Sequence, residues 1–198
     1  MKEFLIGIDE AGRGPLAGPV AVGAVSVPID FDWSQVAGAK DSKQMTPKSR
    51  EDIYKKMCAL RREGKLDFAV AFSSAAAIDT RGIVPAVQSA LNNALAKITK
   101  VDPRHCRVLL DGGLHAPKEF QDQKTIIRGD QLETVISLAS IAAKVLRDRL
   151  MIRAAQKYPV YGFDIHKGYG TLAHRLAIKR NGVCELHRTT FCTKLCPR

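Results

Sequence analysis

The hydrophobic pattern at the start of the chain predicts two β-strands joined by a short connection rich in glycine and proline. Residues 4–8 form an apolar run, and residues 20–27 form a second run that contains several β-branched side chains and ends at Pro28. Apolar runs of this length, bounded by turn residues, are typical of buried strands. Because the connection between them is short, we predict that these strands pair as an antiparallel hairpin.

Helical and strand patterns follow each other along the rest of the chain. Thr46 and Pro47 form a cap residue followed by a proline at the first helical position, which predicts a helix that Gly64 ends. Further strands are predicted at 66–72, 107–111 and 124–127, and further helices at 83–98, at 132–151 with an end at Tyr158-Pro159, and between Thr171 and Gly182. The order of these elements predicts an α/β fold, a mixed β-sheet flanked by helices with a C-terminal helical cap.

Length and composition indicate one globular domain over residues 1–198. A chain of this length buries roughly 70% of its unfolded surface, and 45% of its residues are apolar. The apolar run at the N-terminus is too short for a signal peptide, and charged residues interrupt the stretch 132–151, so we expect no membrane segment. The odd number of cysteines, five, without a C-x-x-C pair fits a reducing compartment, and we expect a cytoplasmic protein.

Positive charge is concentrated in the last third of the chain. The net charge is +11, and residues 140–198 carry twelve basic and three acidic residues. A one-sided basic distribution is typical of proteins that bind the phosphate backbone of nucleic acids. The alternative is a solvated basic face. We therefore predict a basic C-terminal helical segment, at about residues 160–198, that contributes to nucleic-acid binding.

Acidic residues stand at the ends of predicted strands. Asp9 and Glu10 follow the first apolar run, Asp111 closes a later one, and Asp130 follows the short strand at 124–127. In an α/β sheet, ligands gather at the carboxyl ends of parallel strands, so these acids are expected to meet. Four carboxylates without histidine or cysteine are hard oxygen ligands that favour Mg²⁺ or Mn²⁺. Two such ions about 4 Å apart can support phosphodiester hydrolysis.

A glycine-rich segment follows the first acids directly. Gly12 and Gly14 flank Arg13, so bare backbone amides and a guanidinium group can approach an anionic or hydroxyl-bearing ligand. The alternative interpretation is a β-turn whose acids are merely solvated.

Several motifs together resemble one known family, the bacterial ribonucleases HII of the RNase H-like superfamily. The resemblance covers nearly the whole chain and rests on the segments Asp9-Glu10-Ala11-Gly12-Arg13-Gly14-Pro15-Leu16-Ala17-Gly18-Pro19, Asp41-Ser42-Lys43, Asp111-Gly112, Gly129-Asp130, Ser140-Ile141-Ala142-Ala143-Lys144, Arg147-Asp148, His166-Lys167-Gly168-Tyr169 and His187-Arg188.

The resemblance implies a metal-dependent endonuclease that cleaves the RNA strand of RNA–DNA hybrids. It also implies nicking on the 5′ side of a single ribonucleotide embedded in duplex DNA, as in ribonucleotide excision repair, with 3′-hydroxyl and 5′-phosphate products. The residues that match the family's metal-binding and catalytic acids are Asp9, Glu10, Asp111 and Asp130. Gly12, Arg13 and Gly14 match the segment that grips the ribonucleotide, and Tyr169 matches the tyrosine that packs on the adjacent sugar. A monomer is expected.

Two other functions remain as alternatives. Ribonuclease HIII belongs to the same superfamily, but it carries an N-terminal substrate-binding domain and a different residue between the glycines. A non-catalytic nucleic-acid-binding module would share the basic surface without cleaving.

Four side-chain groups also have two interpretations each. Lys43 contacts a substrate phosphate or pairs with Asp41. Lys144 and Asp148, four residues apart on a helix, are interpreted as a structural pair rather than as metal ligands. His166 and His187 contact phosphate or make structural hydrogen bonds. The residues with zinc-type side chains near the C-terminus, in an unusual spacing that argues against zinc, are Cys184, His187, Cys192 and Cys196.

Overall fold

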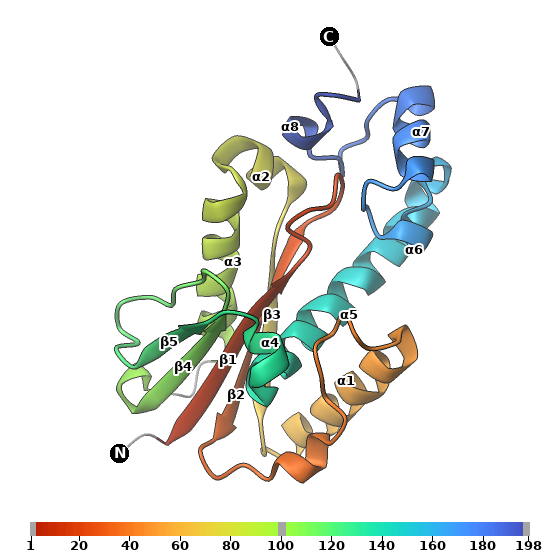
Figure 1. Cartoon of the computed structure of the whole chain (residues 1–198). Helices are drawn as coiled ribbons and strands as arrows, with labels where there is room; N and C mark the ends of the chain where they lie inside the picture. Colours follow the sequence, from red (N-terminus) through yellow and green to blue (C-terminus); the bar gives the residue numbers. More distant parts are fainter. Residues whose placement is uncertain (1–2, 99–101, 196–198) are drawn as a thin grey trace.

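The computed structural model describes residues 3–98 and 102–195. In this part of the chain the strands form a five-stranded sheet of order β3-β2-β1-β4-β5. The strands are β1 (Phe4–Ala11), β2 (Val20–Pro28), β3 (Asp67–Ser73), β4 (Cys106–Asp111) and β5 (Gln123–Ile126). Helices cover both faces of this sheet (Figure 1). The predicted α/β fold with a mixed sheet is therefore confirmed.

Strand direction places the ends of β1 and β4 side by side. β1 and β2 pair as the predicted antiparallel hairpin, and β2 pairs with β3 in the same sense. β1 and β4 are parallel, with Ile8 opposite Leu110, and β4 continues in parallel with β5. Because this register aligns the residues that follow, Asp9 and Asp111 lie at the same edge of the sheet.

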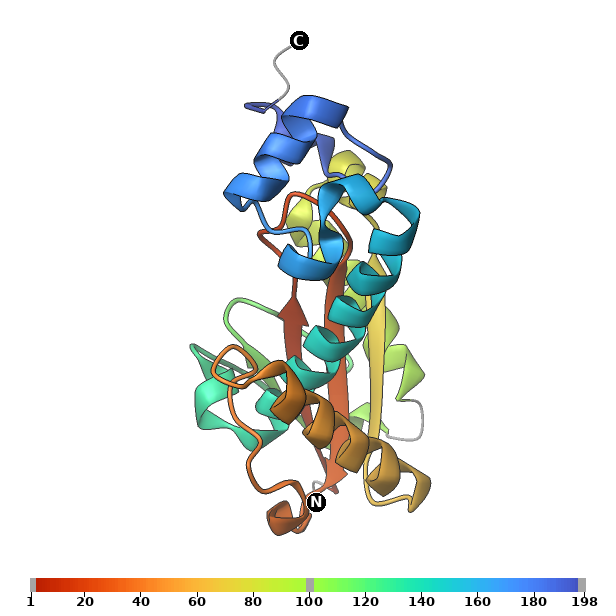
Figure 2. The same cartoon turned by 90° about the vertical axis from the view of Figure 1, so that its right-hand side faces the viewer.

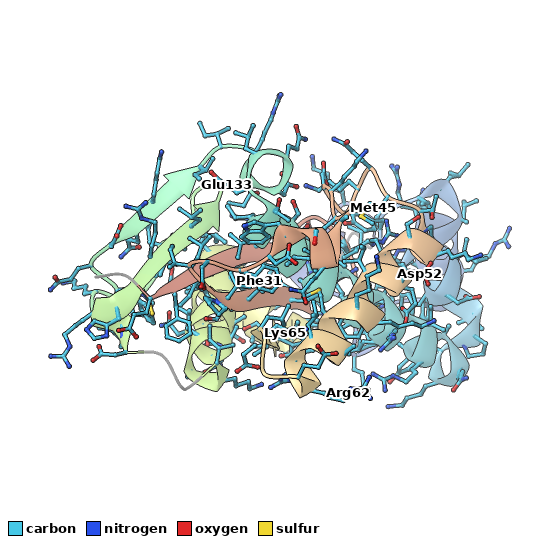
Figure 3. The ribbon with its side chains drawn as sticks, turned by 90° about the horizontal axis from the view of Figure 1, so that it is seen from below. Phe31, Met45, Asp52, Arg62, Lys65 and Glu133 are labelled. Atoms are coloured by element: carbon cyan, nitrogen blue, oxygen red, sulfur yellow. The ribbon has the colours of Figure 1, made fainter. Side chains whose placement is uncertain are left out.

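Alternation along the strands separates two apolar cores. Ile6 and Ile8 point toward α3 (Ile83–Lys97), whereas Val25 and Val27 point to the opposite face. That opposite face is covered by α1 (Pro47–Arg62) and α5 (Thr134–Lys157), and α5 crosses the sheet obliquely (Figure 2). Seen from below, the segment from Phe31 to Met45, which includes a 3₁₀ turn at Trp33–Val36, leads into α1 (Figure 3). The predicted start of α1 is confirmed, since the Thr46 hydroxyl accepts a hydrogen bond from Ser49 N–H.

Two glycines let α5 lie directly on the sheet. A Cβ on Gly7 of β1 would meet the carbonyl oxygen of Val135 at 2.3 Å, and one on Gly23 of β2 would meet the carbonyl oxygen of Ala139 at the same distance. Backbone-to-backbone contact of this closeness excludes any side chain. The N-terminal half of α5 is therefore fixed against β1 and β2.

The C-terminal residues form the predicted helical cap beside the upper half of α5 (Figure 1). The cap contains a 3₁₀ turn at Pro159–Tyr161 and the helices α6 (Phe163–His166), α7 (Leu172–Asn181) and α8 (Thr189–Cys192). Its small core joins Ala17, Met151, Tyr161 and Phe163. The cap thus packs against the loop between β1 and β2 as well as against α5.

The structure adds several short helices to the predicted elements. A 3₁₀ turn at Pro103–His105 precedes β4, and α2 (Ala75–Arg81) lies between β3 and α3. Another, α4 (Gly129–Leu132), carries Asp130, which follows the predicted strand at 124–127. These helices are too short for a periodic apolar pattern to be visible in the sequence. No helix in the described residues is long and apolar enough to cross a membrane.

Candidate active site

Three carboxylates from separate elements converge at the ends of β1 and β4. Asp9 lies near the C-terminal end of β1, Asp111 ends β4 and Asp130 lies in α4. One oxygen atom of each lies within 4.8 Å of the others. Asp9 and Asp130 are both 3% exposed. Asp111 is fixed by the Gly129 N–H, which donates to its Oδ1 at 2.7 Å. The parallel register of β1 and β4 brings the first two acids together, and the backbone bond to Asp111 holds the start of α4 beside them.

Glu10 borders this carboxylate group but is held differently. Its Oε1 accepts a hydrogen bond from Arg13 Nη1 at 3.2 Å, and its Oε2 is buried without a hydrogen-bond partner among the described residues. Burial raises the pKa of Glu10, the Arg13 guanidinium opposes this, and the negative charge of Asp111 raises it further. The predicted fourth acid therefore lies near Asp111, outside the group that shares the 4.8 Å limit.

Burial and, after it, mutual repulsion determine the electrostatics of the site. Burial raises the pKa of Asp9 well above its usual range, and the charges of Glu10 and Asp111 raise it further. Burial also raises the pKa of Asp130, with a contribution from Asp111. Buried like charges at this distance destabilise each other unless a cation lies between them. The set of carboxylate oxygens and the unpartnered Glu10 oxygen fit Mg²⁺ or Mn²⁺.

A layer of polar residues supports the carboxylates from behind. Ser140 of α5 hydrogen-bonds to Asp9, and its hydroxyl lies 2.8 Å from the Ser42 hydroxyl. Asp41 is buried and accepts hydrogen bonds from the Lys43 backbone N–H at 2.8 Å and from the Gln131 amide at 3.2 Å. Burial raises the pKa of Asp41, but these hydrogen bonds outweigh it and lower the pKa. From the sequence, Asp41 was considered only as a partner of Lys43, and Ser42 and Ser140 only as parts of motifs.

Lys43 pairs with the carboxylate group itself. Its Nζ lies 3.5 Å from Oδ2 of Asp130, so the ion pair that one of the two interpretations assigned to Asp41 forms with Asp130 instead. Burial lowers the pKa of Lys43, but the negative charges of Asp130 and Asp9 outweigh that effect and raise the pKa. The Lys43 side chain is 77% exposed, so its ammonium group can also reach a ligand.

The glycine-rich segment forms an exposed loop directly after the acids. Arg13 and Gly14 are exposed, while Gly12 is buried with a positive φ of 92°. A Cβ on Gly12 would meet Nε of Arg147 at 2.1 Å. Both the backbone conformation and the neighbouring guanidinium thus require glycine at this position.

Tyr169 lies beside this loop, on a segment attached to it. The Gly168 carbonyl accepts hydrogen bonds from the backbone N–H groups of Leu16 and Ala17 at 2.9 and 3.2 Å. The Tyr169 ring is 44% exposed, and the guanidinium of Arg147 lies 5.9 Å from its centre. The structure therefore brings the predicted substrate-binding residues Gly12, Arg13, Gly14 and Tyr169 to neighbouring positions.

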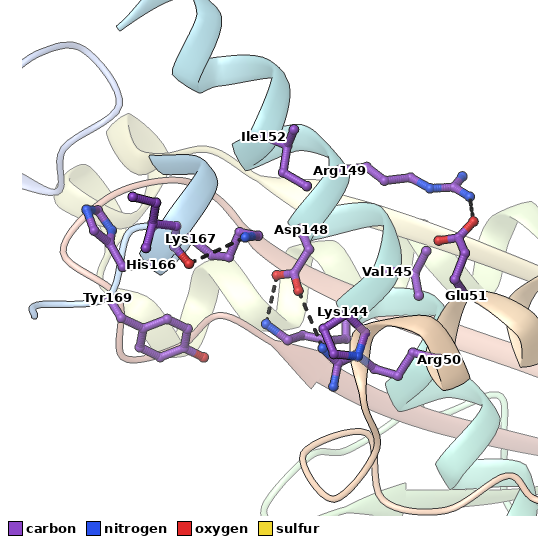
Figure 4. A pocket seen from close by; sticks show the side chains of 12 residues that line it. Arg50, Glu51, Lys144, Val145, Asp148, Arg149, Ile152, His166, Lys167 and Tyr169 are labelled. Carbon is purple, nitrogen blue, oxygen red and sulfur yellow. Dashed lines mark hydrogen bonds and ion pairs between the residues drawn. The ribbon is translucent and has the colours of Figure 1, made fainter. Parts of the chain in front are cut away.

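A pocket of about 410 Å³ lies on the other side of Tyr169, between α1, α5 and α6 (Figure 4). Its basic side chains have partners within the protein. Lys144 donates to Asp148 at 2.7 Å, and Arg50 lies 4.0 Å from the same carboxylate. The predicted structural pair of Lys144 and Asp148 is thereby confirmed. The other basic side chains of the pocket are Arg149, which pairs with Glu51, and Lys167, which donates to the Asp164 carbonyl.

Buried histidines connect the cap to Tyr169. Nδ1 of His187 accepts from the Cys184 N–H at 2.9 Å, so neutral His187 carries its proton on Nε2. Nε2–H of His187 then donates to Nε2 of His174, with 3.1 Å between the two nitrogens, and Nδ1–H of His174 donates to the Tyr169 carbonyl at 2.9 Å. Both rings are thus neutral in this chain of hydrogen bonds. Nδ1 of His166 likewise accepts from Gly168 N–H, so this histidine too makes structural bonds.

These histidines predict a loss of stability in acid. Burial lowers the pKa of His174 from 6.5 to about 4, with contributions from the nearby His166 and His187. Since the unfolded state binds the proton first, stability is lost as the pH falls from about 6.5 to 4, by up to about 3 kcal/mol. Urea denaturation at pH 7 and pH 4.5 measures this loss. His174→Asn should reduce the loss, and His115→Asn, at an exposed histidine, should not. An unchanged loss in His174→Asn contradicts the prediction.

The cysteine-containing tail uses its side chains for packing. The Cys184 Sγ lies 3.2 Å from Nδ1 of His187, whereas the buried Cys192 Sγ approaches the Leu16 carbonyl. In the described residues, the carboxylate group above is the one cluster with metal-ligand spacing. Cys196, the last ligand of the zinc alternative, lies outside the described residues.

Comparison with known proteins gives one consistent family. The family model of ribonuclease HII matches residues 6–194. A ribonuclease HII of Endomicrobium trichonymphae is 42% identical over 93% of this chain and 83% of its own length. The crystal structure of ribonuclease H2 from Pyrococcus horikoshii OT3 is similar with a TM-score of 0.73, 26% identity and coverage of 97% and 96% of the two chains.

A more distant structure, Bst-RNase HIII in complex with Mn²⁺, shares the fold with a TM-score of 0.65 and 17% identity. It aligns with 96% of this chain but with only 65% of its own. The family match and the 42% identical relative separate the two ribonuclease types. The chain therefore belongs to the ribonuclease HII family.

Proposed function

We propose that this protein cleaves the RNA strand of RNA–DNA hybrids and nicks duplex DNA on the 5′ side of a single embedded ribonucleotide. Membership of the ribonuclease HII family makes the chain a type 2 ribonuclease H. The main support for the proposed cleavage sites is the convergence of Asp9, Asp111 and Asp130 within 4.8 Å, beside an exposed arginine flanked by glycines. Metal-dependent hydrolysis and ribose recognition then occur at one end of the sheet.

The acids Asp9, Glu10, Asp111 and Asp130 are proposed to hold Mg²⁺ or Mn²⁺. Raised pKa values at Asp9, Glu10 and Asp130 indicate carboxylates that a cation would stabilise in their charged form. When bound, divalent ions supply an activated water and stabilise the departing 3′ oxygen, in a two-metal arrangement. The Gly129 amide and Ser140 keep the Asp111 and Asp9 carboxylates oriented for that role.

Ribose recognition is assigned to the loop residues Gly12, Arg13 and Gly14, with Tyr169 against the neighbouring sugar. A 2′-hydroxyl distinguishes RNA from DNA, and only backbone without a side chain can approach it closely. The exposed backbone at Arg13 and Gly14 and the half-exposed Tyr169 fit that requirement. Lys43, exposed and beside Asp130, is positioned to contact the phosphate at the cleavage site.

Duplex binding is assigned to the basic C-terminal part of the chain. Residues 140–198 supply most of the net positive charge, and they line most of the pocket beside Tyr169 (Figure 4). We further propose that residues 1–198 act as a single catalytic domain, as a monomer and in the cytoplasm. The free thiols of Cys58 and Cys184 support a reducing compartment.

The decisive experiment uses a DNA duplex with one ribonucleotide, labelled at the 5′ end of the strand that contains it. With Mg²⁺ or Mn²⁺ we expect one nick on the 5′ side of the ribonucleotide, leaving a 3′-hydroxyl. An all-DNA duplex of the same sequence is the control and should stay intact. A ribonucleotide-containing duplex that stays uncut with both metals would refute the proposal.

A further inference from the structure

Two arginine side chains lie wholly buried beneath the loop of residues 12–19. Arg147 comes from α5 and Arg188 from the residue that precedes α8, and both are 0% exposed. Within residues 3–98 and 102–195, neither guanidinium has a carboxylate within 4.0 Å. Burying a charge without a counter-charge is strongly unfavourable. This arrangement therefore needs compensation from other polar groups.

The backbone of the loop supplies that compensation to Arg188. Nη1 of Arg188 donates to the Arg13 carbonyl at 2.7 Å, and Nη2 donates to the Gly12 carbonyl at 2.6 Å. Nη2 and Nε also donate to the Gly18 carbonyl, at 2.9 and 3.0 Å. One planar guanidinium thus binds the first and the last turn of the loop at once. The single ammonium group of lysine is less directional and cannot make all of these hydrogen bonds.

Arg147 binds the same loop from the side of Tyr169. Its Nε donates to the Pro19 carbonyl at 2.9 Å and its Nη2 to the Ala17 carbonyl at 3.2 Å. Its Nη1 is buried without a hydrogen-bond partner among the described residues. Burial lowers the pKa of Arg147, and burial together with the charge of Arg147 lowers that of Arg188 to about 10. The protein therefore keeps two adjacent, mutually repelling cations below one loop.

The direction of the loop's amides follows from these bonds. In a trans peptide the N–H points away from the preceding carbonyl. When the Gly12 and Arg13 carbonyls point down to Arg188, the N–H groups of Arg13 and Gly14 point to the outer surface, where both residues are exposed. The two buried positive charges behind them make this outer surface favourable for electron-rich oxygen atoms.

We propose that Arg147 and Arg188 are positioning residues for ribonucleotide selection, which fix the loop carbonyls inward and so present the Arg13 and Gly14 amides to the 2′-hydroxyl. This inference rests on the proposed function and names the groups that orient its recognition loop. Neither arginine contacts the substrate, and each acts through the loop backbone. Arg147 also aligns the loop with Tyr169, since it touches Gly12 and lies below the tyrosine ring.

The test measures selectivity separately from catalysis. Arg188→Lys and Arg147→Lys are made in an Asp111→Asn background, and fluorescence anisotropy gives Kd for a duplex with one ribonucleotide and for its all-DNA counterpart. We expect the preference for the ribonucleotide to fall about tenfold, because the variants lose well-aligned, charge-assisted hydrogen bonds that orient the loop. Affinity for all-DNA should change by less than about threefold, because the positive charge is kept. Arg13→Ala is the comparator and should lower the preference in the same way.

Met57→Ala is the control for a purely structural effect, because Met57 is buried in the core between α1 and the sheet. It should lower the melting temperature while leaving the preference intact. Lysine variants that keep the full preference, or that lose affinity for both duplexes equally, overturn the inference. If one lysine variant is unfolded at the assay temperature, the other decides. An Asp111→Asn parent without any preference for the ribonucleotide would also overturn the inference, whereas only an uncut duplex in the cleavage assay would refute the proposed function.

Discussion

Asp111→Asn is expected to abolish metal-dependent cleavage while leaving duplex binding within about threefold of the parent protein. The substitution removes one negative oxygen from the group formed by Asp9, Asp111 and Asp130. Loss of a metal-binding carboxylate costs several kcal/mol of transition-state stabilisation, so the rate should fall by roughly a thousandfold or more. Single-turnover cleavage of the ribonucleotide-containing duplex with Mg²⁺ or Mn²⁺ measures the rate, and anisotropy measures binding.

The fold should survive this change. The side-chain oxygen of asparagine can accept the Gly129 N–H that now donates to Asp111. Removal of one charge also relieves the repulsion that raises the pKa of Asp9. Asp52→Asn, an exposed acid on α1, is the matched control and should cleave normally (Figure 3). Cleavage by Asp111→Asn at the parental rate would contradict the metal assignment, and a parent that binds without cleaving would indicate a binding module.

Gly7→Ala is expected to destabilise the protein by about 3 kcal/mol. The new methyl group would lie 2.3 Å from the Val135 carbonyl oxygen and 2.7 Å from the Ile136 nitrogen, which are backbone atoms of α5 that cannot rotate away. The start of α5 must then move away from β1. Because Ser137 Oγ of α5 donates to the Asp130 carbonyl, this movement should also displace Asp130 from Asp9. Urea denaturation measures the free energy of unfolding, and the folded variant should cleave slowly.

Substitutions at two further glycines test whether the clash with α5 causes the loss of stability. Gly23→Ala introduces the same clash against the Ala139 carbonyl oxygen and should destabilise the protein to a similar degree. Gly113→Ala has no atom within 4 Å of the new methyl group and should change stability by less than about 0.5 kcal/mol. Equal stability of Gly7→Ala and Gly113→Ala would show that α5 does not press on the sheet as described.

Most elements of the fold were predictable because their signals are local. The hairpin of β1 and β2, the cap at Thr46 and the helix between Thr171 and Gly182 follow from short apolar runs and from residues with marked conformational preferences. The added helices α2, α4 and α6 span at most two turns. Their helical state depends on neighbours in space, so a periodic pattern was absent from the sequence.

Some residues of the candidate site were likewise predictable from local signals, and others were not. The four acids and the glycine-flanked Arg13 could be found because each stands at a strand end or in a distinctive motif. Of the two interpretations of Lys43, the ion pair with Asp41 named the wrong carboxylate, since Asp130, which lies 87 residues further along the chain, is the one at 3.5 Å. The roles of Arg147 and Arg188 were also missed, because their partners are backbone carbonyls more than a hundred residues away.

By itself, the sequence determined the α/β class, the basic C-terminal third, the acids available to bind metal and the family resemblance. These properties depend on residue type and on spacing within a few residues. Only the tertiary structure decided which acids share one 4.8 Å group, that Glu10 lies at its border, and that two buried guanidiniums hydrogen-bond to the glycine loop. The reason is that parallel pairing of β1 with β4 and the packing of α5 join segments distant in the chain, and contacts of that kind leave no local pattern in a single sequence.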